Sequence, residues 1–146
     1  MPVADEASGR RPAVNEKREM PTKEIRCALL ADRHLSLMEG VRGLLETEFE
    51  AVVVVGDEVS LFETARQLEV TLAVVDLSLA RGDGPGLIRR IRIRFPKLKL
   101  IALSVHAEKG VELATIEAGA NGFVPKGSIA TDLLPTIDAV LGRSAT

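Results

Sequence analysis

The sequence predicts an α/β fold in which a parallel β-sheet lies between two layers of helices. Short, continuous runs of apolar residues alternate along the chain with longer segments whose apolar residues recur at helical spacing. Strict alternation of strands and helices is typical of a parallel sheet covered on both faces, because a crossover helix joins each strand to the next. The clearest strand is the buried run 72–76, which ends on a carboxylate, Asp76.

Composition limits the class of protein. The chain has 146 residues, of which 46% are hydrophobic, which is enough for one domain with a proper core. A net charge of −2 argues against bulk electrostatic attraction to nucleic acid or membranes, and no apolar run reaches the roughly 18 residues of a membrane span. The single cysteine, Cys27, lies in an apolar run and is expected to be a buried thiol in a reducing, cytoplasmic compartment.

Five strand–helix units are expected after an N-terminal segment. Residues 1–24 hold three prolines and no periodic pattern, so we expect a disordered or loosely attached tail before a domain spanning 25–146. The expected strands are 25–30, 51–55, 72–76, 98–104 and 122–125. The expected helices are 37–45, 61–68 with Asp57 or Ser60 as its cap, 87–95, 111–118 and 129–141.

Three segments carry further sequence signals. The glycine-rich stretch 81–86 predicts a flexible loop. Pro135 falls inside the last helical pattern, where proline costs about 3 kcal/mol, so we expect that helix to begin late, near Thr131, or to kink. A basic run is expected to form a solvated helix face rather than a nucleic-acid patch; it comprises Arg89, Arg90, Arg92, Arg94, Lys97 and Lys99.

Right-handed crossovers in a chain of this length favour a flavodoxin-like three-layer sandwich with strand order 2-1-3-4-5. In that order the carboxyl ends of four neighbouring strands meet at one edge of the sheet. The polar residues that this brings together are Asp32, Arg33, Asp76, Ser104 and Lys126. Each alone could be a helix cap or a solvated loop residue. Their convergence favours a functional site.

Residues 25–141 resemble the receiver domain of bacterial two-component response regulators of the LuxR/NarL type. The matching stretches are 29–34 (LLADRH), 74–79 (VVDLSL) with 82–84 (GDG), 101–104 (IALS) and 118–128 (AGANGFVPKGS). The resemblance implies a phosphorelay signalling module rather than an enzyme. Asp76 would accept a phosphoryl group from a sensor histidine kinase or phosphotransfer protein. The net charge and the lack of a membrane-length apolar run lead us to expect that the chain itself binds neither nucleic acid nor membrane.

The resemblance also implies a role for the residues around Asp76. Mg²⁺ would be held by Asp32, Asp76 and the backbone carbonyl of Ser78, while Ser104 and Lys126 would contact phosphoryl oxygens. These residue types suit the chemistry, because a phosphoryl group in transfer spreads negative charge over its oxygens and needs cations and hydroxyl donors around it.

The resemblance further implies a switch and an output surface. Phe123 matches the aromatic residue that swings inward when the residue at the position of Ser104 shifts. The surface made by 111–118, 122–125 and 129–141 is the one through which such domains often pair, so it could form a homodimer.

One position departs from the family pattern. Family members usually have a second acid, the direct metal ligand, where this chain has Arg33. Arg33 could pair with Asp76 and occupy the place of the metal, or it could point to solvent and leave Asp32 as a weak anchor for Mg²⁺. Both alternatives predict weak or absent Mg²⁺ binding and slow or absent phosphorylation. A phosphorylation-independent pseudo-receiver, acting as a protein-interaction module, is therefore the alternative function.

Overall fold

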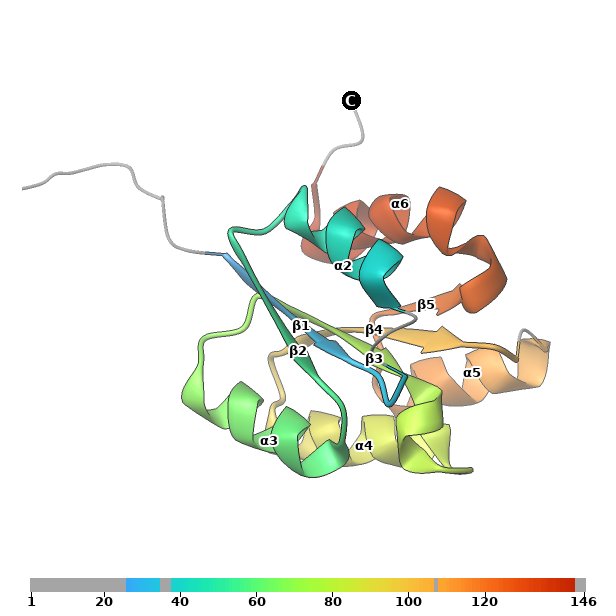
Figure 1. Cartoon of the computed structure of the whole chain (residues 1–146). Coiled ribbons are helices and arrows are strands. Elements are labelled where there is room, and N and C mark those ends of the chain that lie inside the picture. The colour runs from blue at the N-terminus through green and yellow to red at the C-terminus, as the bar shows by residue number, and fades with distance from the viewer. Residues whose placement is uncertain (1–25, 35–37, 107, 144–146) are drawn as a thin grey trace, which may run out of the picture.

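The computed structural model describes residues 26–34, 38–106 and 108–143, which form a five-stranded parallel sheet with helices on both faces (Figure 1). The strands are β1 (Cys27–Ala31), β2 (Ala51–Val55), β3 (Leu72–Asp76), β4 (Lys99–Ser104) and β5 (Gly122–Pro125). Their order, β2-β1-β3-β4-β5, confirms the predicted flavodoxin-like topology. The predicted tail, 1–24, lies outside the residues that the structure describes.

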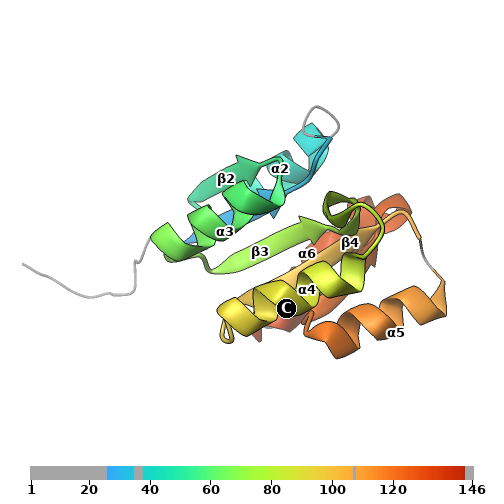
Figure 2. The same cartoon turned by 90° about the horizontal axis from the view of Figure 1, so that it is seen from below.

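Five α-helices complete the three layers. On one face of the sheet lie α2 (Glu39–Glu46) and α6 (Ile129–Leu141). The other face is covered by α3 (Glu58–Gln67), α4 (Gly84–Arg94) and α5 (Lys109–Ala118), as Figure 2 shows from below. Among the described helices, none combines the length and apolar character that crossing a membrane requires.

The central strands are buried on both faces, which explains their continuous apolar runs. In β1, Ala28 and Leu30 pack with the α2–α6 side, whereas Leu29 and Ala31 pack with the α3–α4–α5 side, and all four are fully buried. The same alternation continues along β3 and β4. The two cores, one on each face of the sheet, fix the positions of the strands. They therefore also fix the positions of the residues at the carboxyl ends of the strands.

Two aspartate caps set where α3 and α4 begin. Asp57 accepts a hydrogen bond of 2.7 Å from the Ser60 N–H, so Asp57 is the cap of α3. Asp83 accepts a bond of 3.0 Å from the Gly86 N–H, and α4 therefore begins at Gly84, three residues earlier than predicted. The expected flexible loop 81–86 is wrong for its second half. An aspartate cap and a proline in the first turn, Pro85, favour a helix there despite the glycines.

Helix α6 begins at Ile129, so the predicted late start near Thr131 is wrong. Pro135 lies inside the helix on its exposed side, while Leu133 and Ile137 are fully buried against the sheet. Burial of these two side chains offsets the hydrogen bond that Pro135 cannot make, and the helix runs through the proline.

Arg92 differs from the solvated residue that the basic run predicts. Its guanidinium is partly buried and donates hydrogen bonds of 2.6–3.1 Å to the carbonyl oxygens of four residues and to the side chain of Asn121. The four carbonyl groups belong to Phe95, Pro96, Leu98 and Gly119. Burial lowers the pKa of the Arg92 guanidinium. The other five basic residues of the run are exposed, as predicted.

Candidate functional site

Asp76 is the last residue of β3 and is 1% exposed. Its Oδ1 accepts a hydrogen bond of 2.8 Å from the Ser78 N–H, which starts the short 3₁₀ turn η2 (Leu77–Ala80). This bond fixes the orientation of the carboxylate at the carboxyl edge of the sheet. The second oxygen, Oδ2, is also buried and contacts the ammonium of Lys126.

Asp32 follows β1, the strand that pairs with β3, and its side chain is fully buried. The Asp32 N–H donates to the Val55 carbonyl at 3.0 Å, which extends the β1–β2 pairing by one bond. Its Oδ1 accepts a bond of 2.7 Å from the His34 N–H. Both ends of the residue are thus held, and Oδ2 lies on the side of Asp76 and Lys126.

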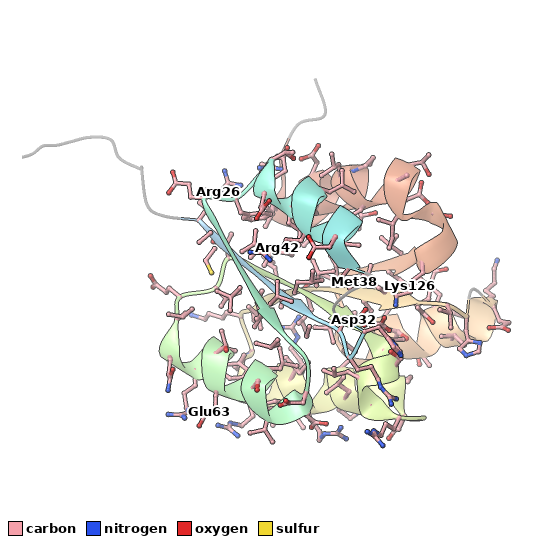
Figure 3. All side chains as sticks on the ribbon, viewed as in Figure 1. Arg26, Asp32, Met38, Arg42, Glu63 and Lys126 are labelled. Carbon is pink, nitrogen blue, oxygen red and sulfur yellow. The ribbon has the colours of Figure 1, made fainter. Side chains whose placement is uncertain are left out.

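Lys126 begins the short turn η3 (Lys126–Ser128) directly after β5. Its Nζ lies 3.1 Å from Oδ2 of Asp32 and also contacts Oδ2 of Asp76. Figure 3 shows Asp32 and Lys126 near one another at the carboxyl ends of the strands. One ammonium therefore bridges two carboxylates at the carboxyl ends of two neighbouring strands, β1 and β3.

Asp32, Asp76 and Lys126 shift one another's pKa values. Burial, followed by the hydrogen bond with Asp76, raises the pKa of the Asp32 carboxyl. Burial also acts to raise the pKa of Asp76, but its hydrogen bonds with Asp32, Lys126 and the Ser78 N–H together outweigh burial and lower it. Burial acts to lower the pKa of Lys126, and the two carboxylates outweigh this and raise it. The contacts with Lys126 and the Ser78 N–H thus favour the ionised form of Asp76.

A hollow of about 370 Å³ opens beside Asp76. Ser104, at the end of β4, lines it; this residue is buried, and its Oγ accepts a bond of 2.9 Å from the His106 N–H. Ser78 also lines it, and its buried Oγ has no hydrogen-bond partner within the described part of the chain. Arg33 and Arg81 line the same hollow from exposed positions. The hollow therefore offers hydroxyl groups and cations around one carboxylate.

The sequence-predicted residues are brought together to different degrees. Asp32, Asp76 and Lys126 are in contact, and Ser104 lies at the hollow with Asp76. The half-buried Phe123 packs against the core on the α3–α4–α5 side.

The cation paired with Asp76 is Lys126, while Arg33 is exposed at the rim. Sequence reasoning missed the Ser78 hydroxyl and Arg81. Arg81 adopts the left-handed conformation, with φ 55°, in the stretch predicted only as a flexible loop. The signal for it was a basic residue beside Gly82, five residues after Asp76.

The donor set fits a Mg²⁺ ion with few protein ligands. Oδ2 of Asp32 and Oδ2 of Asp76 are buried oxygens, and both contact the Lys126 ammonium. The Ser78 carbonyl keeps a second lone pair while accepting a 3.1 Å bond from the Arg81 N–H. Two carboxylates and a carbonyl are oxygen ligands of the kind that Mg²⁺ prefers.

Comparison with known proteins identifies the family. Residues 28–138 match the response regulator receiver domain. The transcriptional regulatory protein RcsB of Escherichia coli K12 is 31% identical over 118 residues, which cover 77% of this chain and 54% of RcsB. DegU of Brevibacillus brevis is 25% identical over 114 residues, 77% of this chain and 48% of DegU. The chain thus spans about half the length of these curated relatives.

Solved structures of response regulators resemble this chain as well. The isolated REC domain of RcsB from Salmonella enterica serovar Typhimurium, in the apo form, has a TM-score of 0.71 and 29% identity, covering 82% of this chain and 90% of that one. A LuxR-family two-component response regulator from Aurantimonas sp. SI85-9A1 has the same score and identity, covering 82% and 88%. Together with the matched family domain and the predicted strand order, these likenesses confirm the resemblance in the sequence. This chain belongs to the response regulator receiver domain family.

Proposed function

We propose that this receiver domain takes part in a phosphorelay by accepting a phosphoryl group on Asp76. The donor would be the phosphohistidine of a sensor histidine kinase or of a phosphotransfer protein. The observation that carries the proposal is the contact between the Asp76 carboxylate and the Lys126 ammonium at the edge of a hollow that Ser104 also lines. Family membership supports the role.

The proposed step needs a carboxylate nucleophile and a site that accommodates negative charge. A carboxylate oxygen of Asp76 attacks phosphorus, the P–N bond of the phosphohistidine breaks, and its electron pair returns to the imidazole. The product is an acyl phosphate on Asp76. Lys126, which already contacts Asp76, would form an ion pair with the phosphoryl oxygens. The Ser104 hydroxyl would donate a hydrogen bond to one of these oxygens.

Mg²⁺, when bound, would neutralise charge on the phosphoryl oxygens. Asp32, Asp76 and the Ser78 carbonyl are the groups that would hold it. We propose that they hold it weakly, because the Lys126 ammonium contacts both carboxylates and Arg33 adds a further positive charge at the rim.

Phe123 is proposed as the switch residue. It lies in β5 opposite Ala102 of β4, close in register to the strand end that carries Ser104. A shift of Ser104 toward a phosphoryl group would thus change the space available to Phe123 on the neighbouring strand. The proposed output and homodimer surface is formed by α5, β5 and α6. Leu113 and Ile116 of α5 are 56% and 40% exposed, which is apolar surface that a partner could cover.

A second candidate function is a pseudo-receiver that binds a partner protein without phosphorylation. The observation that favours it is Arg33, which stands where the family pattern has a metal-binding acid and lies at the rim of the hollow. In that case the domain would use the same surfaces but would not be switched by Asp76.

Acetyl phosphate with Mg²⁺ separates the two functions. Intact-mass spectrometry of the treated chain should show the addition of one phosphoryl group, which Asp76→Asn should abolish. Asp132→Asn, at an exposed aspartate of α6, is the matched control and should be labelled like the wild type. Absence of labelling across a range of Mg²⁺ concentrations would favour the pseudo-receiver.

A further inference from the structure

We propose that Arg33 and Arg81 form a phosphate clamp that works without a metal ion. The clamp binds a phosphate group, free or attached to Asp76, in the hollow of about 370 Å³ that both arginines line together with Ser78 and Ser104. The inference rests on the proposed function only for the covalent form of the ligand. Binding of free phosphate requires no reaction at Asp76.

Arg33 is directed to the rim by its neighbour. The preceding residue, Asp32, is fully buried and is held by its bonds with Val55 and His34. The chain leaves β1 at this fixed point, so the exposed Arg33 is presented at the carboxyl edge of the sheet. Within the described residues, Asp76 takes its ion pair from Lys126 and thus leaves Arg33 available for an external anion.

Arg81, which also lines the hollow, follows Asp76 in the chain, whereas Arg33 precedes it. Its backbone has φ 55° and ψ 54°, and it is the one residue other than glycine with positive φ in the part of the chain that the structure describes. The Arg81 N–H is bonded to the Ser78 carbonyl, which closes the turn η2. A residue that keeps a side chain in this unfavourable conformation is a candidate for a functional role. At this position the side chain is that of Arg81, which adds a second guanidinium to the hollow.

The charges favour an anion. Two carboxylates, Asp32 and Asp76, stand against three cations, Lys126, Arg33 and Arg81, so the site carries one excess positive charge before any metal or phosphate enters. Guanidinium groups match phosphate oxygens with paired N–H donors and form charge-assisted hydrogen bonds.

Neutral donors complete the environment. The buried Ser78 Oγ has no protein partner in the described segments, and the Ser104 hydroxyl lines the same hollow. A tetrahedral phosphate can therefore receive hydrogen bonds from hydroxyl groups inside and from guanidinium groups at the rim.

Inorganic phosphate is the probe that tests the clamp. The ¹⁵N-labelled full chain is titrated with phosphate in EDTA at low ionic strength, and the amide signals of Ser78, Arg81 and Ser104 are followed by NMR. Arg33→Gln and Arg81→Gly should each weaken phosphate binding about tenfold, the worth of one charge-assisted interaction. Glycine at 81 suits the left-handed backbone, so that variant is expected to keep its fold. Arg89→Gln, at an exposed arginine of α4, is the matched control and should bind like the wild type.

Asp76→Asn separates the clamp from the phosphoacceptor. Removing this negative charge should leave phosphate binding intact or tighten it, while it abolishes labelling by acetyl phosphate. If labelling succeeds but phosphate binding is absent, or is the same in Arg33→Gln and Arg89→Gln, the clamp is wrong and the phosphoacceptor stands. If phosphate binds in an arginine-dependent way and labelling fails, the clamp stands and the phosphoacceptor is wrong.

Discussion

The Nζ atom of Lys126 lies 3.1 Å from Oδ2 of Asp32, a pairing between the turn after β5 and the end of β1. The same ammonium contacts Asp76 at the end of β3. It is therefore the only cation, among the residues that the structure describes, that is paired with both buried carboxylates. This arrangement serves the proposed chemistry, and it also stabilises the edge of the sheet.

Lys126→Met should destabilise the domain at neutral pH. Two buried carboxylates would lose their shared counter-ion, and because Lys126 is 18% exposed we expect a loss of about 1–3 kcal/mol in the free energy of unfolding, below the full cost of breaking a buried pair. Urea denaturation measures it. Lys97→Met, at an exposed lysine, is the control. Equal midpoints for the two variants would show that the ion pairs contribute nothing.

Arg92→Ala should be more disruptive than any other change in the basic run. The side chain joins the end of α4 to the residue before β4 and to the turn after α5 through its bonds to Leu98 and Gly119. Removing it leaves several carbonyl groups without donors, so we expect a loss of about 2–3 kcal/mol. Thermal and urea unfolding of Arg92→Ala and Arg89→Ala provide the comparison, with a change below about 0.5 kcal/mol for the exposed Arg89. Similar stabilities in both variants would contradict this role of Arg92.

Cys27 should make stability fall at alkaline pH. Burial raises the pKa of its thiol above the ordinary value of 9.0. Because the thiol pKa is higher in the folded chain than in the unfolded chain, the neutral thiol contributes to stability. This contribution is fully present below the unfolded pKa and is lost as pH rises through the folded pKa. Unfolding free energies measured from neutral pH to above pH 9 should decline less steeply in Cys27→Ala than in the wild type. Parallel pH profiles for the two proteins would contradict the shift.

Pro135→Ala should stabilise the domain. The exposed Pro135 lacks the N–H that an α-helix uses at this position, and alanine would restore it without changing the buried face of α6. We expect a gain of about 1–3 kcal/mol, reduced by the greater freedom of the unfolded chain. Pro85→Ala is the control, because Pro85 lies in the first turn of α4, where the missing N–H has no partner in the helix. A loss of stability in Pro135→Ala would show that the proline is favoured there.

Much of the site could be predicted because it follows from topology. Once the apolar runs around Asp76 and Ser104 are assigned to parallel strands, the carboxyl ends must meet at one edge, and Lys126 after the last strand must join them. The structure has these strands next to one another in the predicted order. The burial of Asp32 and Asp76 follows from the same argument, since neighbouring strands and the turns after them enclose these positions.

One feature that could not be predicted depends on a local competition between helix signals, and two others depend on contacts between distant segments. The early start of α4 depends on the Asp83 cap, which outweighs the low helix propensity of Gly84 and Gly86. Arg92 resembles its basic neighbours in the sequence, and the approach of Gly119 from the end of α5 helps to make it a partly buried donor. The choice of Lys126 over Arg33 as the partner of Asp76 likewise depends on side-chain reach, which spacing along the chain does not give.

Chemical trapping of the phosphorylated residue tests the central claim most directly. The chain is treated with acetyl phosphate and Mg²⁺ and reduced with borohydride, which converts a phosphorylated aspartate to homoserine, and the peptides are then sequenced by mass spectrometry. The account predicts homoserine at position 76, with Asp32 unchanged, and no conversion in Lys126→Met. Conversion at another aspartate, or phosphorylation that is unaffected by loss of Lys126, would contradict it.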